Sequence, residues 1–275
     1  MWGEGDGHIR EALFRVLGLK PCPARVQAEA VSCFRKLCAE EGSARLGAAQ
    51  LFSQARGPFG DFISEDPEAC SENAPSEPNM YTDGSLRRPT LHQYSLGGFG
   101  ILCRSRNLQL DALHHNEQNL AHIDERSGDV HLYAPLPGSR CSSTRTEVAG
   151  ILLALFRPGP VHIASDSRSA VVTMQSILQK QPRMKPWNLH PNGDLWQLIA
   201  KFVPIRGAAS IAIKWVKGHT VKDDVERGII SLADHLGNHI ADQLADQGVD
   251  KHFDGLGSLG CFYASRRHAY LKVVH

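Results

Sequence analysis

The sequence lacks an excess of charge of either sign. Its 30 lysines and arginines are almost balanced by 29 aspartates and glutamates, so the formal net charge is only +1. No overall basic field attracts a polyanion to the whole molecule, which counts mildly against a stand-alone nucleic-acid binder. These numbers leave room for a local basic groove.

The sequence also lacks long apolar runs. No stretch approaches the roughly 18 consecutive apolar residues that a membrane-spanning helix requires. Residues 1–6 contain no basic segment followed by an apolar run, so we expect no signal peptide. These absences predict a soluble, intracellular protein of the cytoplasm or nucleus that makes no contact with a membrane.

Clustered cysteines are missing as well. The chain has seven cysteines, an odd number, and the closest two are Cys33 and Cys38. Scattered cysteines without metal-ligand spacing are typical of free, mostly buried thiols in a reducing compartment. The sequence therefore indicates neither a disulfide framework nor a zinc site.

Composition divides the chain into four parts. Residues 1–57 show apolar side chains at helical spacing on both sides of Pro21 and Pro23, which predicts a helical N-terminal extension. This extension is expected to be structural or to dock a protein partner. Residues 58–78 form an acidic, Pro/Ser-rich linker that buries too little to offset its chain entropy. A folded domain is expected over 79–250, followed by a tail over 251–275.

Within 79–250 the pattern alternates between strands and helices. Strands are expected at 80–83, 97–103, 130–135, 161–166 and 210–216, and helices around 148–155, 170–178, 195–202 and 240–245. The polar, His-rich stretch 108–129 is interpreted as an insertion, and Asp194 is placed to cap the third helix. Three consecutive strands followed by alternating helices and strands predict an α/β fold with a mixed five-stranded sheet flanked by helices.

Four carboxylates are expected at the ends or on the faces of these elements. Asp83 ends the first strand before a predicted turn, Glu147 begins the first helix, Asp166 ends the fourth strand and Asp242 lies on the last helix. Each has an ordinary explanation on its own: a turn residue, a capping box with Thr144, a helix cap and a solvated charge. Four independent explanations account poorly for their joint occurrence in this order.

Converging carboxylates would need a reason, because each raises the pKa of its neighbour. A bound divalent cation is the natural one. Hydrolysis of a phosphodiester requires an activated water and relief of charge on the leaving oxygen, and two hard cations held by carboxylates supply both.

The motifs that contain these residues resemble those of the type 1 ribonuclease H family. They are 81–85 (YTDGS), 145–147 (RTE), 165–167 (SDS), 215–219 (WVKGH) and 237–242 (GN-x-x-AD). The resemblance covers about 79–248 and implies a ribonuclease H-like fold. It also implies four metal ligands, Asp83, Glu147, Asp166 and Asp242, for two Mg²⁺ ions bridged by Asp83, with Mn²⁺ as the alternative. By the same resemblance, His219 would assist departure of the product.

The substrate that the resemblance implies is an RNA–DNA hybrid. Family members cut its RNA strand internally and leave 3′-hydroxyl and 5′-phosphate ends. Ser142, Ser143 and Thr144 lie where family members contact the hybrid, although bacterial relatives favour amides there. Lys185 and Trp187, in the basic loop 180–187, are the expected phosphate and stacking contacts.

Two departures from the family pattern leave the four acids untouched, and two other functions stay open. The insertion 108–129 is long for the family, and the segment between His219 and Asp242 is longer than in bacterial relatives. The first alternative is another nuclease of the same fold. The second is a catalytically inert domain that binds nucleic acid or protein.

Overall fold

The computed structural model describes residues 66–87, 95–104, 120–136, 141–183 and 185–252, together with the single residues Leu113, Glu117, Ser265 and His268. Nearly all of these belong to one compact unit, Ala55–Gly260. The predicted helical extension over 1–57 and most of the predicted tail lie outside the described residues. No described helix is both long enough and apolar enough to cross a bilayer.

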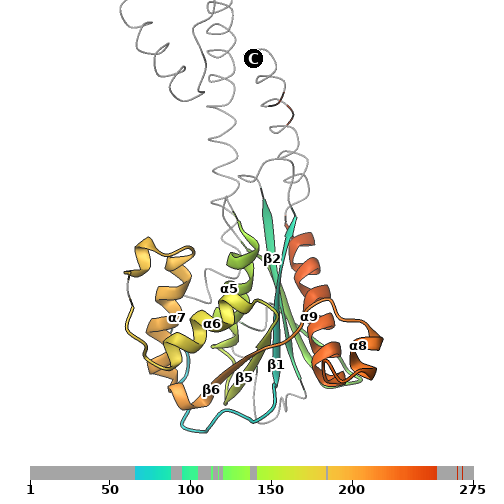
Figure 1. Ribbon diagram of the computed structural model, residues 1–275, viewed down its shortest axis with the longest axis horizontal. Coiled ribbons are helices and arrows are strands. Elements are labelled where there is room, and N and C mark those ends of the chain that lie inside the picture. Colours follow the sequence, from blue (N-terminus) through green and yellow to red (C-terminus); the bar gives the residue numbers. More distant parts are fainter. Residues whose placement is uncertain are drawn as a thin grey trace, which may run out of the picture. The chain divides into compact units, whose positions relative to one another are not determined.

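A mixed sheet of six strands forms the centre of the described part of the chain (Figure 1). Its spatial order is β3-β4-β2-β1-β5-β6. The neighbours β4–β2 and β2–β1 run antiparallel, while β5 and β6 run parallel to β1. The strands are β1 (Met80–Arg87), β2 (Leu96–Cys103), β3 (Ala121–Ile123), β4 (Val130–Leu136), β5 (Val161–Ser165) and β6 (Ile211–Trp215).

The sheet contains one strand more than the five expected. The extra strand, β3, lies within the stretch interpreted as an insertion. Among the described residues it pairs with β4 alone, placing His122 opposite His131. The first strand is also longer than predicted, because Asp83 is not followed by a turn. Residues up to Arg87 continue to pair with β2, where Asp83 lies opposite Gly100. Pairing with a partner strand here overrides the turn preference of Asp-Gly-Ser.

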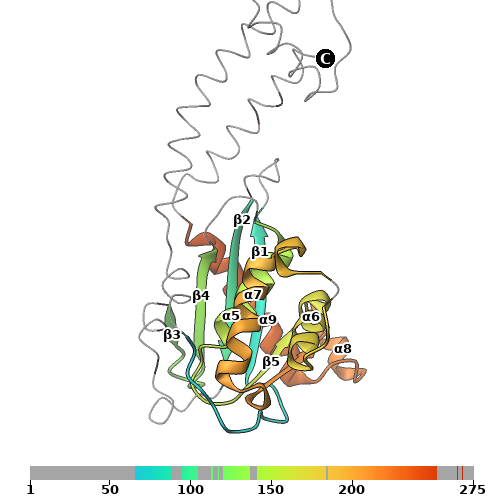
Figure 2. The same cartoon turned by 90° about the vertical axis from the view of Figure 1, so that its left-hand side faces the viewer.

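Helices cover both faces of the sheet. The helices α5 and α7, with α6 beside them, lie on one face, and α9 lies on the other (Figures 1 and 2). The first of these faces carries the larger apolar core, which includes Phe99, Ile151 and Trp196. The helices are α5 (Ser143–Ala154), α6 (Arg168–Leu178), α7 (Gly193–Arg206), the short α8 (Lys222–Glu226) and α9 (Leu232–Asp250). Two 3-10 turns, η2 (Trp187–Leu189) and η3 (Ala208–Ser210), flank α7.

Glycines allow α9 to lie directly on the sheet. A Cβ on Gly100 of β2 would come within 2.3 Å of the Ala245 nitrogen, and one on Gly98 within 2.3 Å of the Val249 nitrogen. Side chains at these positions would push the helix away from the strand. The close contact holds α9, and with it Asp242, next to the central strands.

The cap predicted for α7 is wrong. Asn192, with a φ of 56°, precedes the helix, and Asp194 lies inside its first turn. The Asp194 carboxylate instead forms a two-pronged pair with the Arg145 guanidinium, with N–O distances of 2.9 and 2.6 Å. Such a charge-assisted contact is stronger than a neutral cap, and it ties α7 to the start of α5.

The described part of the expected linker, 66–78, makes hydrogen bonds with the domain. Cys70 N donates to Arg206 O over 2.7 Å, and Ala74 N donates to Ala209 O over 2.9 Å. An exposed ion pair of 2.6 Å joins Lys201 to Asp66. Backbone hydrogen bonds of this kind hold the acidic segment along the end of α7.

Candidate active site

Two of the predicted acids, Asp83 and Asp166, directly follow two residues that are paired across neighbouring strands. The last register pair between the parallel strands β1 and β5 is Thr82 with Ser165. Asp83 and Asp166 are the next residues along each strand, so their backbones leave the shared edge side by side. The parallel pairing therefore delivers two carboxylates to one end of the sheet, where ligand sites of α/β folds lie.

The third acid, Glu147, comes from α5. The helix begins at Ser143, and the Ser142 hydroxyl caps it by accepting a hydrogen bond from Arg145 N. This places Glu147 in the second turn, so the capping box considered for it does not form. A Cβ on Gly84 would approach Glu147 N to 2.5 Å, which shows how tightly β1 packs against this turn.

These three carboxylates converge. Asp83, Glu147 and Asp166 each offer an oxygen, and the three oxygens lie within 4.8 Å of one another. Asp83 and Glu147 are buried, with 5% and 8% of their surface exposed. Gly84 N donates to Asp83 Oδ1 over 2.7 Å. Among the described residues, nothing donates to the buried Glu147 Oε2.

Burial and mutual repulsion hold protons on this cluster. Burial, with added repulsion from Asp166 and Asp242, raises the pKa of Asp83 to about 8. Burial and the Asp83 charge raise the pKa of Glu147 well above its usual range. The two side chains also share a hydrogen bond, which lowers the pKa of Asp83 and raises that of Glu147.

The cluster fits a hard divalent cation. A buried carboxylate oxygen without a donor is costly, and three acids of raised pKa in one place repel each other when ionised. A cation such as Mg²⁺ takes oxygen ligands and would relieve both costs. The donor set contains no sulfur, so it does not favour a soft metal.

Asp242 and His219 lie near the three acids but outside the tight group. Asp242, half-buried on α9, is close enough for its charge to raise the pKa of both Asp83 and Asp166. Burial raises the pKa of Asp166, whereas the charge of His219 lowers it. His219 is exposed and has a left-handed backbone, with a φ of 49°. The structure thus gathers all five predicted residues in one region.

Sequence reasoning missed three residues that hold Asp166 in place. The Trp215 indole Nε1 donates to Asp166 O over 2.9 Å. The Asn238 side chain, 4% exposed, makes a hydrogen bond to the Asp166 carboxylate that lowers its pKa. A Cβ on Gly218 would lie 2.0 Å from Asp166 Oδ2. All three belong to motifs noted in the sequence, but only the fold reveals that they share one carboxylate.

The predicted nucleic-acid contacts at the start of α5 lie one turn before Glu147. Ser142 is half-buried as the helix cap, Ser143 is exposed and Thr144 is half-buried. The Ser143 carbonyl accepts a hydrogen bond of 2.6 Å from the Thr146 hydroxyl. Within the described residues, the hydroxyls of Ser143 and Thr144 form no hydrogen bond.

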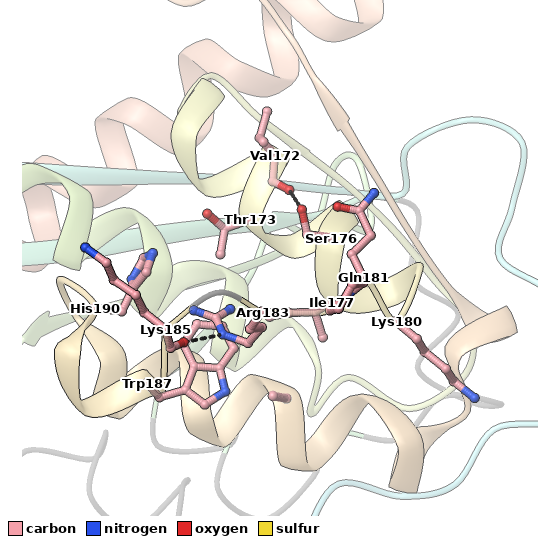
Figure 3. Close-up of a pocket in the computed structure, with 12 residues that line it drawn as sticks. Val172, Thr173, Ser176, Ile177, Lys180, Gln181, Arg183, Lys185, Trp187 and His190 are labelled. Carbon is pink, nitrogen blue, oxygen red and sulfur yellow. Dashed lines mark hydrogen bonds between the residues drawn. The ribbon is translucent and has the colours of Figure 1, made fainter.

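The basic loop lines a separate groove of about 610 Å³ between the end of α6 and α7 (Figure 3). Lys180, Arg183, Lys185 and His190 contribute its basic side chains. The Arg183 guanidinium lies 3.0 Å from the centre of the Trp187 ring. Trp187 also packs nearly parallel to Trp196, with ring centres 6.4 Å apart. The ring predicted to stack on a base is therefore already covered by a guanidinium.

The strand order, the helices on both faces and the acid cluster define a ribonuclease H-like α/β protein. The family model described as RNase H matches residues 75–250, more than half of the chain, and the chain belongs to that family. The resemblance seen in the motifs is confirmed, and membership indicates a nuclease-type function.

Several solved structures are similar to the chain at low sequence identity. The protease-reverse transcriptase of prototype foamy virus is 23% identical, with a TM-score of 0.43, over 65% of this chain and 22% of that one. The solution structure of the PFV RNase H domain is 22% identical, with a TM-score of 0.42, over 68% and 97% of the two chains. LC9-RNase H1, a type 1 RNase H with the type 2 active-site motif, is 17% identical, with a TM-score of 0.39, over 69% and 75%. The chain thus spans about a fifth of the foamy virus protease-reverse transcriptase. No curated protein matches it.

Proposed function

We propose that the chain is a metal-dependent endonuclease that hydrolyses the RNA strand of an RNA–DNA hybrid, leaving 3′-hydroxyl and 5′-phosphate ends. The observation that carries this proposal is the convergence of Asp83, Glu147 and Asp166 within 4.8 Å in a chain of the RNase H family. The Glu147 oxygen without a donor supports it further. An inert domain would have no reason to maintain this costly cluster.

Asp83, Glu147, Asp166 and Asp242 would hold two Mg²⁺ ions, or Mn²⁺ in their place, with Asp83 contacting both. When bound, the ions activate a water and neutralise charge on the leaving oxygen. The chain's own residues prepare this site. Asp83 and Glu147, whose pKa values are raised by burial, would lose their protons on binding, because a carboxylate ligand must be ionised.

Other side chains orient the ligands and the product. Asn238 and Trp215 fix the carboxylate and the backbone of Asp166, as outer groups around metal ligands commonly do. His219, exposed beside Asp166, assists departure of the cut strand by passing a proton to it or by contacting its phosphate.

Recognition of the hybrid would use two surfaces. The hydroxyls of Ser143 and Thr144, one turn before Glu147, would read the 2′-hydroxyl that distinguishes RNA from DNA. Ser142 caps that turn. Lys185 and Arg183 would contact backbone phosphates from the groove. Trp187 contributes by holding Arg183 over its ring.

The test is cleavage of a labelled RNA–DNA hybrid with Mg²⁺, beside single-stranded RNA, duplex RNA and a sample with EDTA. We expect cuts within the RNA strand of the hybrid alone, abolished by EDTA, with product ends that a polymerase extends without prior phosphatase treatment. Equal cleavage of duplex RNA would point instead to another nuclease of this fold. Binding of the hybrid without cleavage would favour the inert domain.

A further inference from the structure

The carboxylate of Asp224 connects two ends of a short loop in the segment between β6 and α9. Asp224, on α8, accepts from Lys217 Nζ over 2.8 Å at one oxygen and from Val221 N over 3.1 Å at the other. The hydrogen bond from Lys217 is also the main cause of the lowered pKa of Asp224. These two partners lie on either side of residues 218–220. Asp224 therefore closes a short loop, and His219 lies at its tip.

A second hydrogen bond ties this tip to α9. The Thr220 hydroxyl lies 2.7 Å from His235 Nδ1. His235 is half-buried near the start of α9, and its ring stacks on that of His239, with centres 6.4 Å apart and planes 9° apart. Figures 1 and 2 place α8 beside this end of α9. The residue after His219 is thus anchored to a helix that also carries Asp242.

The backbone of His219 depends on such anchors. Its φ of 49° lies in the left-handed region, which a residue with a Cβ adopts only where its surroundings hold it. On one side, Gly218 packs against the Asp166 carboxylate. On the other side, Thr220 binds His235. The position of His219 beside Asp166 is set by these two contacts and by the closure through Asp224.

We propose that His235 is a positioning residue that acts through Thr220 to hold His219 beside Asp166. This inference rests on the proposed function, in which His219 assists departure of the product. It gives a role to the long segment between His219 and Asp242, whose length departs from the bacterial pattern. Both α8 and the start of α9 lie in this segment, and their contacts hold the loop that carries the exposed His219.

The test compares steady-state cleavage by two pairs of variants of the full chain. Thr220→Val and His235→Ala remove the hydrogen bond, whereas Thr220→Ser and His235→Asn keep a polar atom at the same position. We expect the first two to lower kcat by about tenfold with little change in KM, because a small misplacement of a catalytic group can cost ~10²-fold. The second two should restore most of the rate. Arg227→Gln, which removes an exposed pair with Asp223 elsewhere in the segment, is the matched control and should behave as wild type.

A double-variant comparison separates positioning from general damage. In a His219→Ala background, Thr220→Val should have no further effect on kcat, because the group that it positions is gone. If Thr220→Val lowered kcat by the same factor in the His219→Ala background as in wild type, the proposal would be overturned. An unchanged kcat for Thr220→Val alone would also overturn it.

Hydrogen–deuterium exchange keeps the inference separate from the proposed function. If the wild-type chain does not cleave the hybrid, the proposed function fails. The exchange rate of residues 216–222 then still tests whether the hydrogen bond between Thr220 and His235 holds the loop. Faster exchange in Thr220→Val than in wild type and Arg227→Gln supports the anchor. Equal exchange in all three contradicts it.

Discussion

Gly218 lies so close to Asp166 that an added methyl group would come within 2.0 Å of the carboxylate Oδ2. Gly218→Ala therefore must move either the loop or the carboxylate. We predict that this variant loses cleavage activity by about tenfold or more, since displacement of a reacting group by ~1 Å can cost 10²-fold. Steady-state kinetics on the hybrid measure the loss, and thermal unfolding shows whether the fold persists.

Gly150→Ala is the control for that variant. A Cβ on Gly150, in α5, would meet nothing nearer than 3.4 Å, which is ordinary contact. We expect it to keep activity and to gain about 0.5–1 kcal/mol in stability, because alanine is the better helix former. If both alanine variants lost activity equally, the contact between Gly218 and Asp166 would have no special role.

Asp83→Asn should stabilise the metal-free protein at neutral and mildly alkaline pH. The folded-state pKa of Asp83, raised to about 8 by burial and nearby acids, lies well above the ordinary value of 3.8 for an aspartate. The folded state thus binds this proton more tightly than the unfolded state does. The contribution of the proton to the free energy of unfolding is fully present below about pH 4 and is lost as the pH rises towards 8. Asparagine has no such proton to lose.

Urea unfolding in EDTA at pH 5 and pH 8 tests this effect. Between these two values, wild type should lose at least ~1 kcal/mol more stability than Asp83→Asn, given 1.36 kcal/mol for each unit of pKa shift. The comparison cancels the titration of the histidines, which both proteins share. Parallel losses would mean that Asp83 is not buried among charges as described.

Mg²⁺ should stabilise the wild-type chain through the same cluster. A ligand that binds only the folded state at 100 times its Kd adds about 2.7 kcal/mol, which for this size corresponds to a rise of roughly 5–10 °C in Tm. Glu147→Gln should respond much less, because it removes the carboxylate whose oxygen lacks a donor. Calorimetry with and without Mg²⁺ measures both, and an equal rise in the two proteins would place the metal elsewhere.

The sheet and the acid cluster followed from the sequence because their signals are local or belong to the family. Buried strands such as β5 read as apolar runs, and each acid stands inside a recognisable motif. The strand β3 did not follow, because its three residues become a strand by pairing with β4. Nor did the extension of β1 beyond Asp83, which depends on β2 as a partner.

Long-range contacts explain what else the sequence left out. Asp194 was expected to cap α7 but pairs with Arg145, which is 49 residues away in the chain. The anchoring of Thr220 by His235 requires that α8 and α9 are already folded. The structure brings Asp83, Glu147 and Asp166 together as expected, while their roles as metal ligands stay predictions.

Lys185→Ala should weaken hybrid binding without changing the chemistry. If Lys185 contacts a phosphate, the slope of log Kd against log salt should fall by about 1, and kcat should change little. Lys251, which lies over the Tyr133 ring outside the groove, provides the control variant Lys251→Ala. Equal salt slopes for Lys185→Ala and wild type would remove the groove from the binding surface.

His219→Ala should slow turnover by roughly 10- to 100-fold without abolishing it, since a proton-transfer group contributes about 10²-fold or more and the acids remain. Single-turnover kinetics should be less affected than steady-state turnover if the histidine acts on product departure. An unchanged steady-state rate would make His219 an ordinary surface residue.

The most direct measurement is cleavage of a labelled RNA–DNA hybrid in Mg²⁺ by the wild-type chain and by Asp83→Asn, side by side. The variant differs only in one carboxylate that the structure places among the converging acids. We predict internal cuts in the RNA strand by the wild-type chain and none by the variant, with both proteins folded and both binding the hybrid. Equal cleavage by the two proteins would contradict the metal site, and cleavage by neither would contradict the nuclease itself.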